Sequence, residues 1–440
     1  MAGSLIYLSL PGRRRQALRA LHGAFPRKTE RQRRAILRES CARLVEMGLF
    51  LLASPHFSDR RIRETVRVSP EDAEALKADI ATDSARPAVL VVPHFTLAET
   101  LTLLPHILPY PMGPTTVVFR PVNQPAVDRW VRETRQRFGL KLASRRDGFS
   151  TVLRRLENNG NAGVLFDQSA GGSGTLITVF GRLASATELP GLLACRRRAE
   201  TIVFIPERTG FWRARLRFHR IEETSPIGIT LGTHRWLERY LAESEEHCAD
   251  WLWLHDRWGT QDKAKRRFHL RGKRNRLAAS NAFHGRSETP RETRLWVTMP
   301  DAPEDCRELL PLLQAIRDSR PDMALTLFTH PETQSELETS GIAERCLVPP
   351  DGKIHRLRFF RRLRHDYPDV HLVFPESFRA DLEAWLAGAP QRFGLHRPGK
   401  PRRLLTDPHK PISLPPDATP AETAAAFLKE YGLREPVRPD

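Results

Sequence analysis

The stretch AVLVVPHFTLAETLTLLPHIL, from Ala88 to Leu108, decides the fold of the first half of the chain. Its apolar, valine-rich beginning predicts a buried strand that ends at Pro93, and the segment from Leu97 to Leu108 has the pattern of a helix. His94 stands directly after the strand, and Glu99 follows five positions later. Because open α/β sheets bind ligands at the carboxyl ends of their strands, this arrangement predicts a site at His94.

The spacing of the histidine and the carboxylate is not informative by itself. With 16 histidines and 52 acidic residues in 440, this spacing is expected about twice by chance, and it occurs twice. The second occurrence, His371 and Glu376, lies in VHLVFPESF, where the histidine is inside a predicted strand. The context therefore favours a functional role for His94 and Glu99 and a structural role for His371.

The segments around this stretch alternate between short apolar runs and helical patterns. We expect strands at AVLVVP, TTVVFRP, GVLFDQ, ITVFG, TIVFIPE and RARLRFH, with helices near 97–108, 126–138, 148–158 and 188–198. Such alternation predicts an α/β domain with a partly parallel sheet. Helices broken at Pro26 and Pro55 are expected before it, over residues 1–67.

The composition points to an anionic partner and to a reducing compartment. The net charge is +18, and residues 1–67 carry 15 basic residues against 5 acidic ones. The segment KAKRRFHLRGKRNR, residues 263–276, has eight basic residues and no acidic one. Such blocks suit an anionic membrane surface, an acidic carrier protein, nucleic acid or simply a solvated linker. The five cysteines lack the paired spacing of a disulfide framework or a zinc site.

The first basic block helps to separate these partners. In RQRRAILRESCARLVEMGLFLLASP, apolar residues recur near helical spacing with arginines between them. This pattern is typical of an amphipathic helix on an anionic lipid surface, and equally of a helix packed on its own domain. The sequence lacks nucleic-acid-binding motifs, and no segment reaches the roughly 18 apolar residues of a spanning helix. We expect a protein that lies on a membrane without crossing it.

Five segments in order resemble the lipid A biosynthesis lauroyl/myristoyl acyltransferases over residues 15–262. They are LHGAFPRKTERQRRAILRES, HFTLAE, VFRPVNQPAVDRWVRETRQRFG, GVLFDQSAGGSGTLITVFGRLASAT and WLWLHDRWGT. The resemblance implies N-terminal helices and a mixed-sheet domain of the glycerolipid-acyltransferase type over residues 1–262. It implies transfer of an acyl chain from acyl carrier protein or coenzyme A to a hydroxyl of a glycolipid, without a metal or cofactor. Transfer to a lysophospholipid or another lipid, and a non-catalytic scaffold, remain open as alternatives.

The resemblance assigns roles to individual residues. It implies that His94 is the general base and that Glu99 is the carboxylate that orients it, as in hydrolytic triads. Arg120, at the end of a predicted strand, is expected to hold a phosphate or to polarise the thioester carbonyl. Asp167 and Gln168 end the GVLFDQ strand, where they either line the cleft or cap the glycine-rich loop that follows. The WLWLHDRWGT segment is expected to close the domain.

The same resemblance implies the cytoplasmic face of a bacterial inner membrane. Many members of the family begin with a hydrophobic anchoring helix, whereas this chain has only SLIYLSL before its first arginines. We therefore expect peripheral or monotopic attachment through the amphipathic helix or the basic patches, or else a truncated start.

A second α/β pattern begins at Arg294, after a basic stretch over residues 263–293 that is expected to be a linker. Residues 294–440 resemble the N-terminal half of the glycosyltransferase family 9 heptosyltransferases, through LWVTMPDAPEDCRELLPLLQAIRDSRPDMALTLF and FPESFRADLEAWLAGAPQRFGLHRPGKPRRLLTD. This predicts a smaller, single Rossmann-like, doubly wound domain. Glu304 replaces the glycine of that family's Leu-Gly-Asp turn, Asp305 is kept, and the remaining chain has no room for a second nucleotide-binding half. We expect this domain not to transfer sugar.

Overall fold

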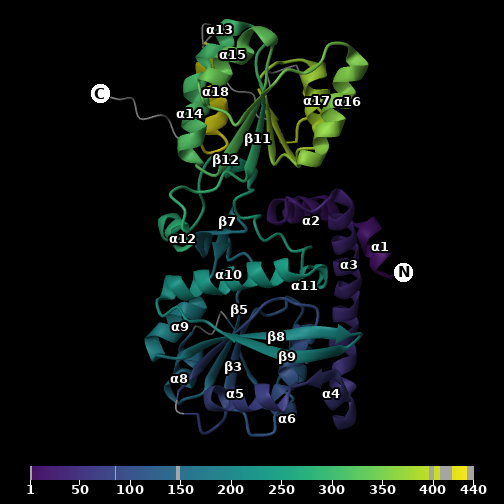
Figure 1. Cartoon of the computed structure of the whole chain (residues 1–440), viewed down its shortest axis with the longest axis vertical. Helices are drawn as coiled ribbons and strands as arrows, with labels where there is room; N and C mark the ends of the chain where they lie inside the picture. Colours follow the sequence, from purple (N-terminus) through teal and green to yellow (C-terminus); the bar gives the residue numbers. More distant parts are fainter. Residues whose placement is uncertain (1, 85, 145–148, 396–400, 407–418, 434–440) are drawn as a thin grey trace. The chain divides into compact units, whose positions relative to one another are not determined.

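The computed structural model describes the chain except for residues 1, 85, 145–148, 396–400, 407–418 and 434–440. The chain forms two compact units (Figure 1). Unit 1 consists of Met1–Val179, Ser185–Arg257 and Lys273–Gly285, and unit 2 consists of Phe180–Ala184, Trp258–Gly272 and Arg286–Asp440. The first domain was expected to extend to residue 262, but its last residues before the basic stretch belong to unit 2.

Unit 1 opens with three helices, α1 (Ala2–Ser9), α2 (Pro11–Ala24) and α3 (Glu30–Ala53). Both predicted breaks are confirmed, because Pro26 lies between α2 and α3 and Pro55 lies in a short 3-10 turn, η1 (Ser54–His56), directly after α3. Thr29 starts α3 through a capping box, in which its side chain accepts from the backbone of Gln32 and the Gln32 side chain accepts in return. The long third helix is thus fixed at its N-terminus.

The centre of unit 1 is a seven-stranded mixed sheet in the order β1-β9-β8-β2-β5-β3-β4. Its strands are β1 (Val66–Arg67), β2 (Ala88–Val92), β3 (Thr115–Phe119), β4 (Lys141–Ser144), β5 (Asn161–Leu165), β8 (Glu200–Gly210) and β9 (Arg213–Arg220). Strands β8 and β9 pair antiparallel, whereas β8, β2, β5, β3 and β4 run parallel. The carboxyl ends of β2, β5 and β3 therefore meet at one edge of the sheet, and the mixed α/β fold is confirmed.

Helices cover both faces of this sheet. Figure 1 shows α10 (Pro226–Glu243) and α11 (Glu245–Asp250) on one side of β8 and β9, and α4 (Asp59–Thr65) and α5 (Pro70–Ile80) on the other. The core on the second side is built by alternate strand residues packed against α3, α4 and α5. Unit 1 also contains η2 (Ala98–Leu103), α6 (Leu104–Ile107), α7 (Pro125–Arg135), α8 (Ser150–Glu157) and α9 (Leu189–Arg197).

The segment predicted as one helix over 97–108 is divided into η2 and α6. Pro105 stands in the first turn of α6, where the missing backbone N–H of a proline is tolerated. A single α-helix through this position would lose a hydrogen bond, so the chain forms a 3-10 segment and then restarts. This division matters below, because it changes the direction in which Glu99 points.

The basic stretch over residues 263–293 is not a simple linker, which corrects the expectation from its charge. Its first part contains η5 (Ala264–Arg266) and belongs largely to unit 2, whereas β10 (Arg274–Asn275) and α12 (Leu277–Phe283) belong to unit 1. Strand β10 pairs in parallel with β6 (Thr175–Val179), in a small sheet of the order β10-β6-β7 completed by β7 (Arg182–Ala186). Edge pairing, which charge patterns do not reveal, anchors this segment.

Unit 2 contains a five-stranded, all-parallel sheet in the order β13-β12-β11-β14-β15, as expected for a single doubly wound domain. Its strands are β11 (Thr293–Thr298), β12 (Met323–Phe328), β13 (Arg345–Leu347), β14 (Val370–Val373) and β15 (Gln391–Gly394). In Figure 1, α16 (Lys353–Leu363) and α17 (Phe378–Ala387) lie on one side of this sheet. On the other side are α13 (Pro303–Glu308), α14 (Leu310–Ser319), α15 (Pro331–Thr339) and α18 (Pro420–Lys429). His371 is buried within β14 with its Nε2 2.9 Å from Thr298 Oγ1, which confirms its structural role.

Candidate active site

His94 lies just beyond β2 and is hydrogen-bonded to a carboxylate that follows β5. Its Nδ1 is 2.5 Å from Oδ1 of Asp167, and Oδ2 of Asp167 accepts the His94 backbone N–H at 2.8 Å. The indole Nε1 of Trp251 donates to the same Oδ2 at 2.6 Å. Asp167 is completely buried, whereas 24% of the His94 side chain is exposed. We call His94 and Asp167 the dyad.

The electrostatics of the dyad fix the tautomer of His94. Burial alone would raise the pKa of Asp167, but the charge of His94 and the hydrogen bonds from His94 and Trp251 outweigh it and lower the pKa to about 2. A carboxylate that remains ionised only accepts hydrogen bonds, so when the imidazole of His94 is neutral its proton is on Nδ1. Its Nε2 then has a free lone pair, which is the arrangement of a general base.

Glu99 has a different partner from the one predicted. Its two carboxylate oxygens accept from Nε and Nη2 of Arg135 in α7, both at 2.8 Å. The residues directly after His94 form a bridge to Trp251 and a turn, and η2 follows in place of an α-helix. This geometry turns Glu99 toward α7, so the carboxylate that orients His94 in the structure is Asp167. Arg135 was missed because its pairing with Glu99 depends on the tertiary packing of α7.

An apolar cavity lies between one face of the sheet and η2, and its lining includes Val92 and Leu165, which stand two residues before His94 and Asp167. Its volume is about 120 Å³, comparable to cavities of roughly 150 Å³ that hold a benzene molecule. Side chains from the central strands form one wall, including Leu90, Val117 and Phe119, and the bidentate pair of Glu99 and Arg135 also lines the cavity. A paired guanidinium and carboxylate present no unbalanced charge to an apolar occupant.

The remaining predicted residues lie at the same edge of the sheet. Arg120 directly follows β3, the neighbour of β5, and its side chain is exposed. Gln168 is half-buried next to Asp167. The structure therefore brings His94 and Asp167 into direct contact and leaves Arg120 and Gln168 at the rim, where the strand ends converge.

The part of the WLWLHDRWGT segment up to Arg257 belongs to unit 1 and supports the dyad, whereas Trp258 and the residues after it belong to unit 2. Arg257 is buried, donates to the carbonyl of Ser185 at 2.7 Å, and lies 3.1 Å from Nε2 of His234. Burial, followed by the charge of Arg257, lowers the pKa of His234 to about 3, so its Nε2 accepts from the guanidinium. His255 lies 3.3 Å from the backbone N–H of Ser169, two residues after Asp167. Burial and Arg257 lower the pKa of His255 to about 4.

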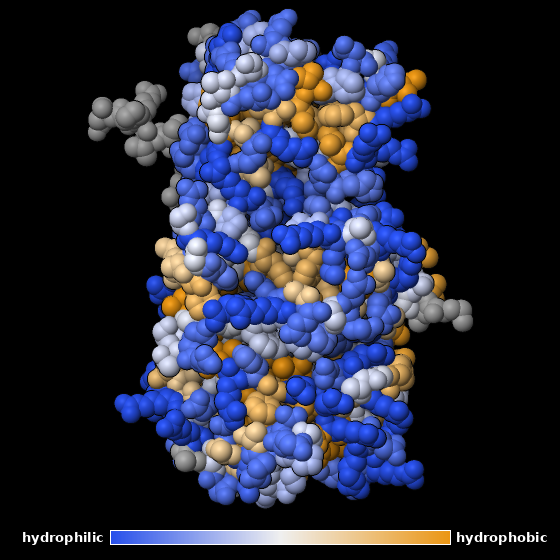
Figure 2. All heavy atoms as spheres, viewed as in Figure 1, coloured by the Kyte–Doolittle hydropathy of each residue, from blue (hydrophilic) through white to orange (hydrophobic). Residues whose placement is uncertain are grey.

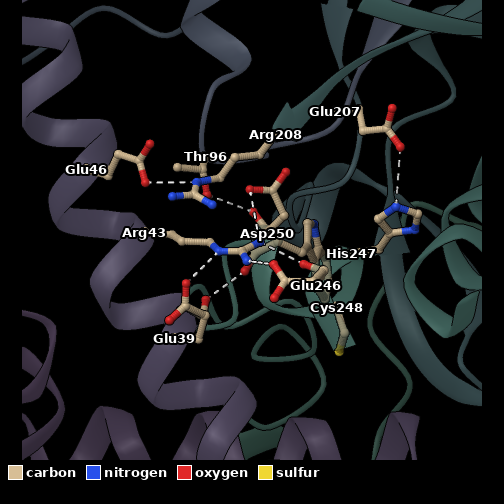
Figure 3. Close-up of polar contacts among 12 residues, drawn as sticks. Glu39, Arg43, Glu46, Thr96, Glu207, Arg208, Glu246, His247, Cys248 and Asp250 are labelled. Atoms are coloured by element: carbon tan, nitrogen blue, oxygen red, sulfur yellow. Dashed lines mark hydrogen bonds and ion pairs between the residues drawn. The ribbon is translucent and has the colours of Figure 1, made fainter. Parts of the chain in front are cut away.

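A group of charged side chains joins α3 to the segment that carries Trp251 (Figure 3). Arg43 donates to the backbone carbonyl of Glu246 at 2.7 Å and its Nη1 is 3.7 Å from the Asp250 carboxylate. The Asp250 carbonyl accepts the N–H of Thr96 at 3.1 Å. Burial raises the pKa of Asp250 to about 6, against the effects of Thr96 and Arg43. The group ties together the two chain segments that meet at the dyad.

Comparison with known proteins identifies the family. The chain matches the model of the bacterial lipid A biosynthesis acyltransferases over residues 2–260. It belongs to this family. The dyad, the apolar cavity and the residues at the edge of the sheet all lie within the matched part of the chain, and within unit 1. In the described part of the chain, no helix is both long and apolar enough to cross a membrane.

Other comparisons cover smaller parts of the chain. The structure of ADP-heptose lps heptosyltransferase II from E. coli is similar at 20% identity, over 23% of this chain and 30% of that one, with a TM-score of 0.22. A glycosyl transferase family 9 structure from Veillonella parvula is similar at 20% identity, over 32% of this chain and 42% of that one, with a TM-score of 0.29. A ribosomal RNA large subunit methyltransferase M from Aromatoleum aromaticum is 30% identical over 109 residues, 24% of this chain and 28% of that protein. The chain thus spans less than half the length of each of these proteins.

Proposed function

We propose that unit 1 transfers a fatty acyl chain from acyl carrier protein to a hydroxyl group of a lipid A-type glycolipid. The observation that carries this proposal is the dyad, whose ionised buried carboxylate leaves Nε2 of His94 free as a base beside an apolar cavity. A base on the loop that leads to an apolar cavity suits a reaction that joins a fatty chain to a polar hydroxyl. The strongly basic chain also suits an acidic carrier protein.

In the proposed reaction, Nε2 of His94 removes the proton of the acceptor hydroxyl as its oxygen attacks the thioester carbonyl. A C–O bond forms and the carbonyl electrons move to oxygen, which gives a tetrahedral intermediate. When the carbonyl re-forms, the C–S bond breaks and the thiolate takes the proton from the imidazolium. Asp167 remains ionised and stabilises that imidazolium through Nδ1, so one residue serves as base and then as acid.

The other residues position the donor. Arg120 is exposed at the edge of the sheet, where its planar guanidinium is suited to the phosphate of the carrier's prosthetic group. Glu99 holds Arg135 at the wall of the cavity, which places a paired cation near the thioester carbonyl while the chain enters apolar surroundings. Gln168, next to Asp167, offers an amide to the polar part of the substrate.

We propose that α1 and α3 supply a membrane-facing surface. On α1, Leu5 is 69% exposed and Leu8 is 64% exposed, and on α3, Leu49 and Leu52 are also exposed. Figure 2 shows orange, apolar side chains reaching the surface along the edge where Figure 1 draws α1 and α3. The arginines that follow α1 add the positive charge that anionic headgroups attract. Peripheral attachment would keep the site close to a lipid acceptor.

Purified protein supplied with radiolabelled acyl carrier protein conjugates and a tetra-acylated lipid A precursor tests the function. We expect labelled glycolipid from the wild type and at least about 10³-fold less from His94→Ala, because the general base is lost. A wild type that labels only a lysophospholipid contradicts the proposed acceptor. A wild type that labels no lipid, or a variant that labels as well as the wild type, contradicts the catalytic proposal.

A further inference from the structure

Unit 1 also contains an open groove whose lining residues differ from those of the apolar cavity. Its volume is about 880 Å³, at the upper end of the roughly 300–1,000 Å³ typical of ligand sites. Its walls come from α8, α9, the loop after β5 and strand β10. All of these segments belong to unit 1.

The groove begins next to the dyad. Ala170 lines it and stands three residues after Asp167, so the two Cα atoms are at most about 10 Å apart. Glu99 lines the apolar cavity and stands five residues after His94. The loop that continues from His94 therefore leads to the cavity, and the loop that continues from Asp167 leads to the groove. One end of the groove thus lies on the loop that carries the carboxylate of the dyad.

One side of the groove is apolar. Phe149 and Leu153 contribute from the start of α8, and Leu189, Leu192 and Leu193 contribute from α9. Phe149 and Leu192 are exposed, although they are large apolar side chains. Exposed apolar side chains that gather along a groove mark a surface for an apolar or amphiphilic partner.

The other side of the groove is cationic. Arg196, Lys273 and Arg274 line it together with a single carboxylate, Glu188. The buried Glu188 accepts from Thr175 and from Arg274, each at 2.7 Å, which fixes that guanidinium at the wall. Lys273 is anchored by its backbone N–H to the carbonyl of Gly174 at 2.8 Å, and within the described residues neither its ammonium nor the Arg196 guanidinium has an ion-pair partner.

From this juxtaposition we propose that the groove binds the phosphates and an apolar part of the glycolipid acceptor, and thereby selects a phosphorylated glycolipid. The inference deepens the proposed function, on which it rests for the identity of the acceptor. The two cationic positions come from separate elements, α9 and β10, and so suit two phosphates on a disaccharide better than the single phosphate of a lysophospholipid. The proposal also gives a role to the basic segment over residues 263–293, which its charge alone had suggested was a linker.

The difference between the apolar cavity and the groove explains why we assign the groove to the acceptor. The donor's acyl chain is a thin hydrocarbon. Apart from the paired Glu99 and Arg135, the side chains that line the narrow cavity are uncharged, so the cavity offers no site for a charged headgroup. The acceptor is a bulky amphiphile, which requires the larger volume, the apolar wall and the cations of the groove. The loop after His94 lines the cavity through Glu99 and the loop after Asp167 lines the groove through Ala170, so in the proposed reaction the thioester and the hydroxyl meet at the dyad.

The test measures binding in the His94→Ala background, where turnover does not interfere. The probes are a bisphosphorylated, tetra-acylated disaccharide lipid and the same lipid with both phosphates removed. We expect Arg196→Glu/Lys273→Glu to raise the Kd of the phosphorylated lipid by about tenfold or more, because two charge-assisted contacts are replaced by repulsion. Binding of the dephosphorylated lipid should be unaffected. When Arg196→Glu/Lys273→Glu is made in the protein that keeps His94, the KM for the acceptor should rise while kcat and the KM for the donor stay constant.

The matched control is Arg213→Glu/Arg215→Glu, which makes the same charge change on the exposed side of β9, outside the groove. An equal loss of binding in this control would show general attraction to a charged surface and overturn the proposal. The proposal would also be overturned if the groove variant bound the phosphorylated lipid as tightly as before, or if millimolar inorganic phosphate competed completely. It would be overturned as well if a lysophospholipid bound equally tightly and with the same dependence on these charges. Because binding is measured without turnover, failure of the groove is distinguishable from failure of the acyl transfer itself.

Discussion

Replacing Asp167 by asparagine is the sharpest test of the dyad, because the structure predicts which way the new amide faces. Oδ2 of Asp167 accepts two donors, the His94 backbone N–H and the Trp251 indole, whereas Oδ1 accepts only Nδ1–H of His94. The oxygen of an asparagine must take the Oδ2 position, since an NH₂ group there would face two N–H donors. The reverse orientation leaves two buried donors unsatisfied, at a cost of roughly 2–6 kcal/mol.

This orientation places the amide N–H against Nδ1 of His94, which must then become the acceptor. The imidazole proton moves to Nε2, where the lone pair of the base is needed. The equivalent change in serine protease triads lowers kcat by about 10⁴, and we expect a fall of roughly 10³–10⁴ here. Since the two side chains have nearly the same shape, the fold should be retained.

Nitrogen-15 spectra of protein labelled at histidine, with the His94 signal assigned from His94→Gln, report the tautomer directly. We expect Nδ1–H in the wild type and Nε2–H in Asp167→Asn. Glu99→Gln is the control, because Glu99 binds Arg135 and so should leave the tautomer of His94 unchanged even where activity falls. The reasoning is refuted if Asp167→Asn keeps the wild-type tautomer or more than a tenth of kcat, or if Glu99→Gln switches the tautomer.

Four further predictions follow from other parts of the chain. Gly163→Ala brings its methyl group within 2.9 Å of Cγ2 of Val117 in the cavity wall, so Val117 must shift and the cavity should narrow. The preferred acyl chain in a competition assay should then shorten, with about a fourfold loss of kcat/KM per excluded methylene, and an unchanged preference would place the chain elsewhere. Asp250→Asn should raise the free energy of unfolding by up to about 3 kcal/mol at pH 8, because burial holds the pKa of Asp250 in the folded state above its value in the unfolded state. This gain in stability should vanish as the pH falls from 6 toward 4. A gain that does not depend on pH in denaturant titrations would contradict this reasoning. Leu5→Ser/Leu8→Ser should weaken binding to anionic vesicles roughly thirtyfold in sedimentation assays, whereas unchanged binding would remove α1 from the membrane surface. The intact chain should not transfer heptose from a nucleotide donor, because Glu304 stands where the heptosyltransferase turn has a glycine and disfavours both the backbone conformation that glycine permits and a nearby phosphate. Detected transfer would contradict the inactivity expected of unit 2.

Local sequence patterns predicted the elements that carry the site better than they predicted its contacts. The strand that ends at Pro93 and the strand that precedes Asp167 are both observed, because runs of apolar and β-branched residues between turn signals specify buried strands directly. The small strand β7 was missed, since Arg182–Ala186 is short and polar and is buried only through its neighbours. The edge strand β10 was missed for a related reason, because a basic dipeptide carries no strand signal of its own.

The partner of His94 was not predictable from local spacing. Glu99 is five residues away and Asp167 is 73 residues away, yet Asp167 is the contact, because β2 and β5 are neighbours in the sheet. Strand order in a parallel sheet depends on crossovers, which the sequence does not display. Trp251 shares this property, since a bridge with Phe95 brings it to the dyad. What the sequence did supply was the edge of the sheet at which these residues meet.

The pair of Glu99 and Arg135 marks the boundary between the two environments that the proposed reaction must join. A fatty chain favours the apolar cavity by about 0.8 kcal/mol per buried methylene, whereas the developing charge on the carbonyl oxygen favours nearby cations. A lone arginine in the cavity wall would bring a costly unpaired charge into apolar surroundings, and a lone carboxylate would repel the oxyanion. The bidentate pair avoids the first cost and keeps a cation at the wall. In the proposed reaction, Glu99 therefore has a structural reason to face the donor and not His94. The motif His94-x4-Glu99 would then extend from the proposed base, which meets the hydroxyl, to the cavity wall, which meets the acyl chain.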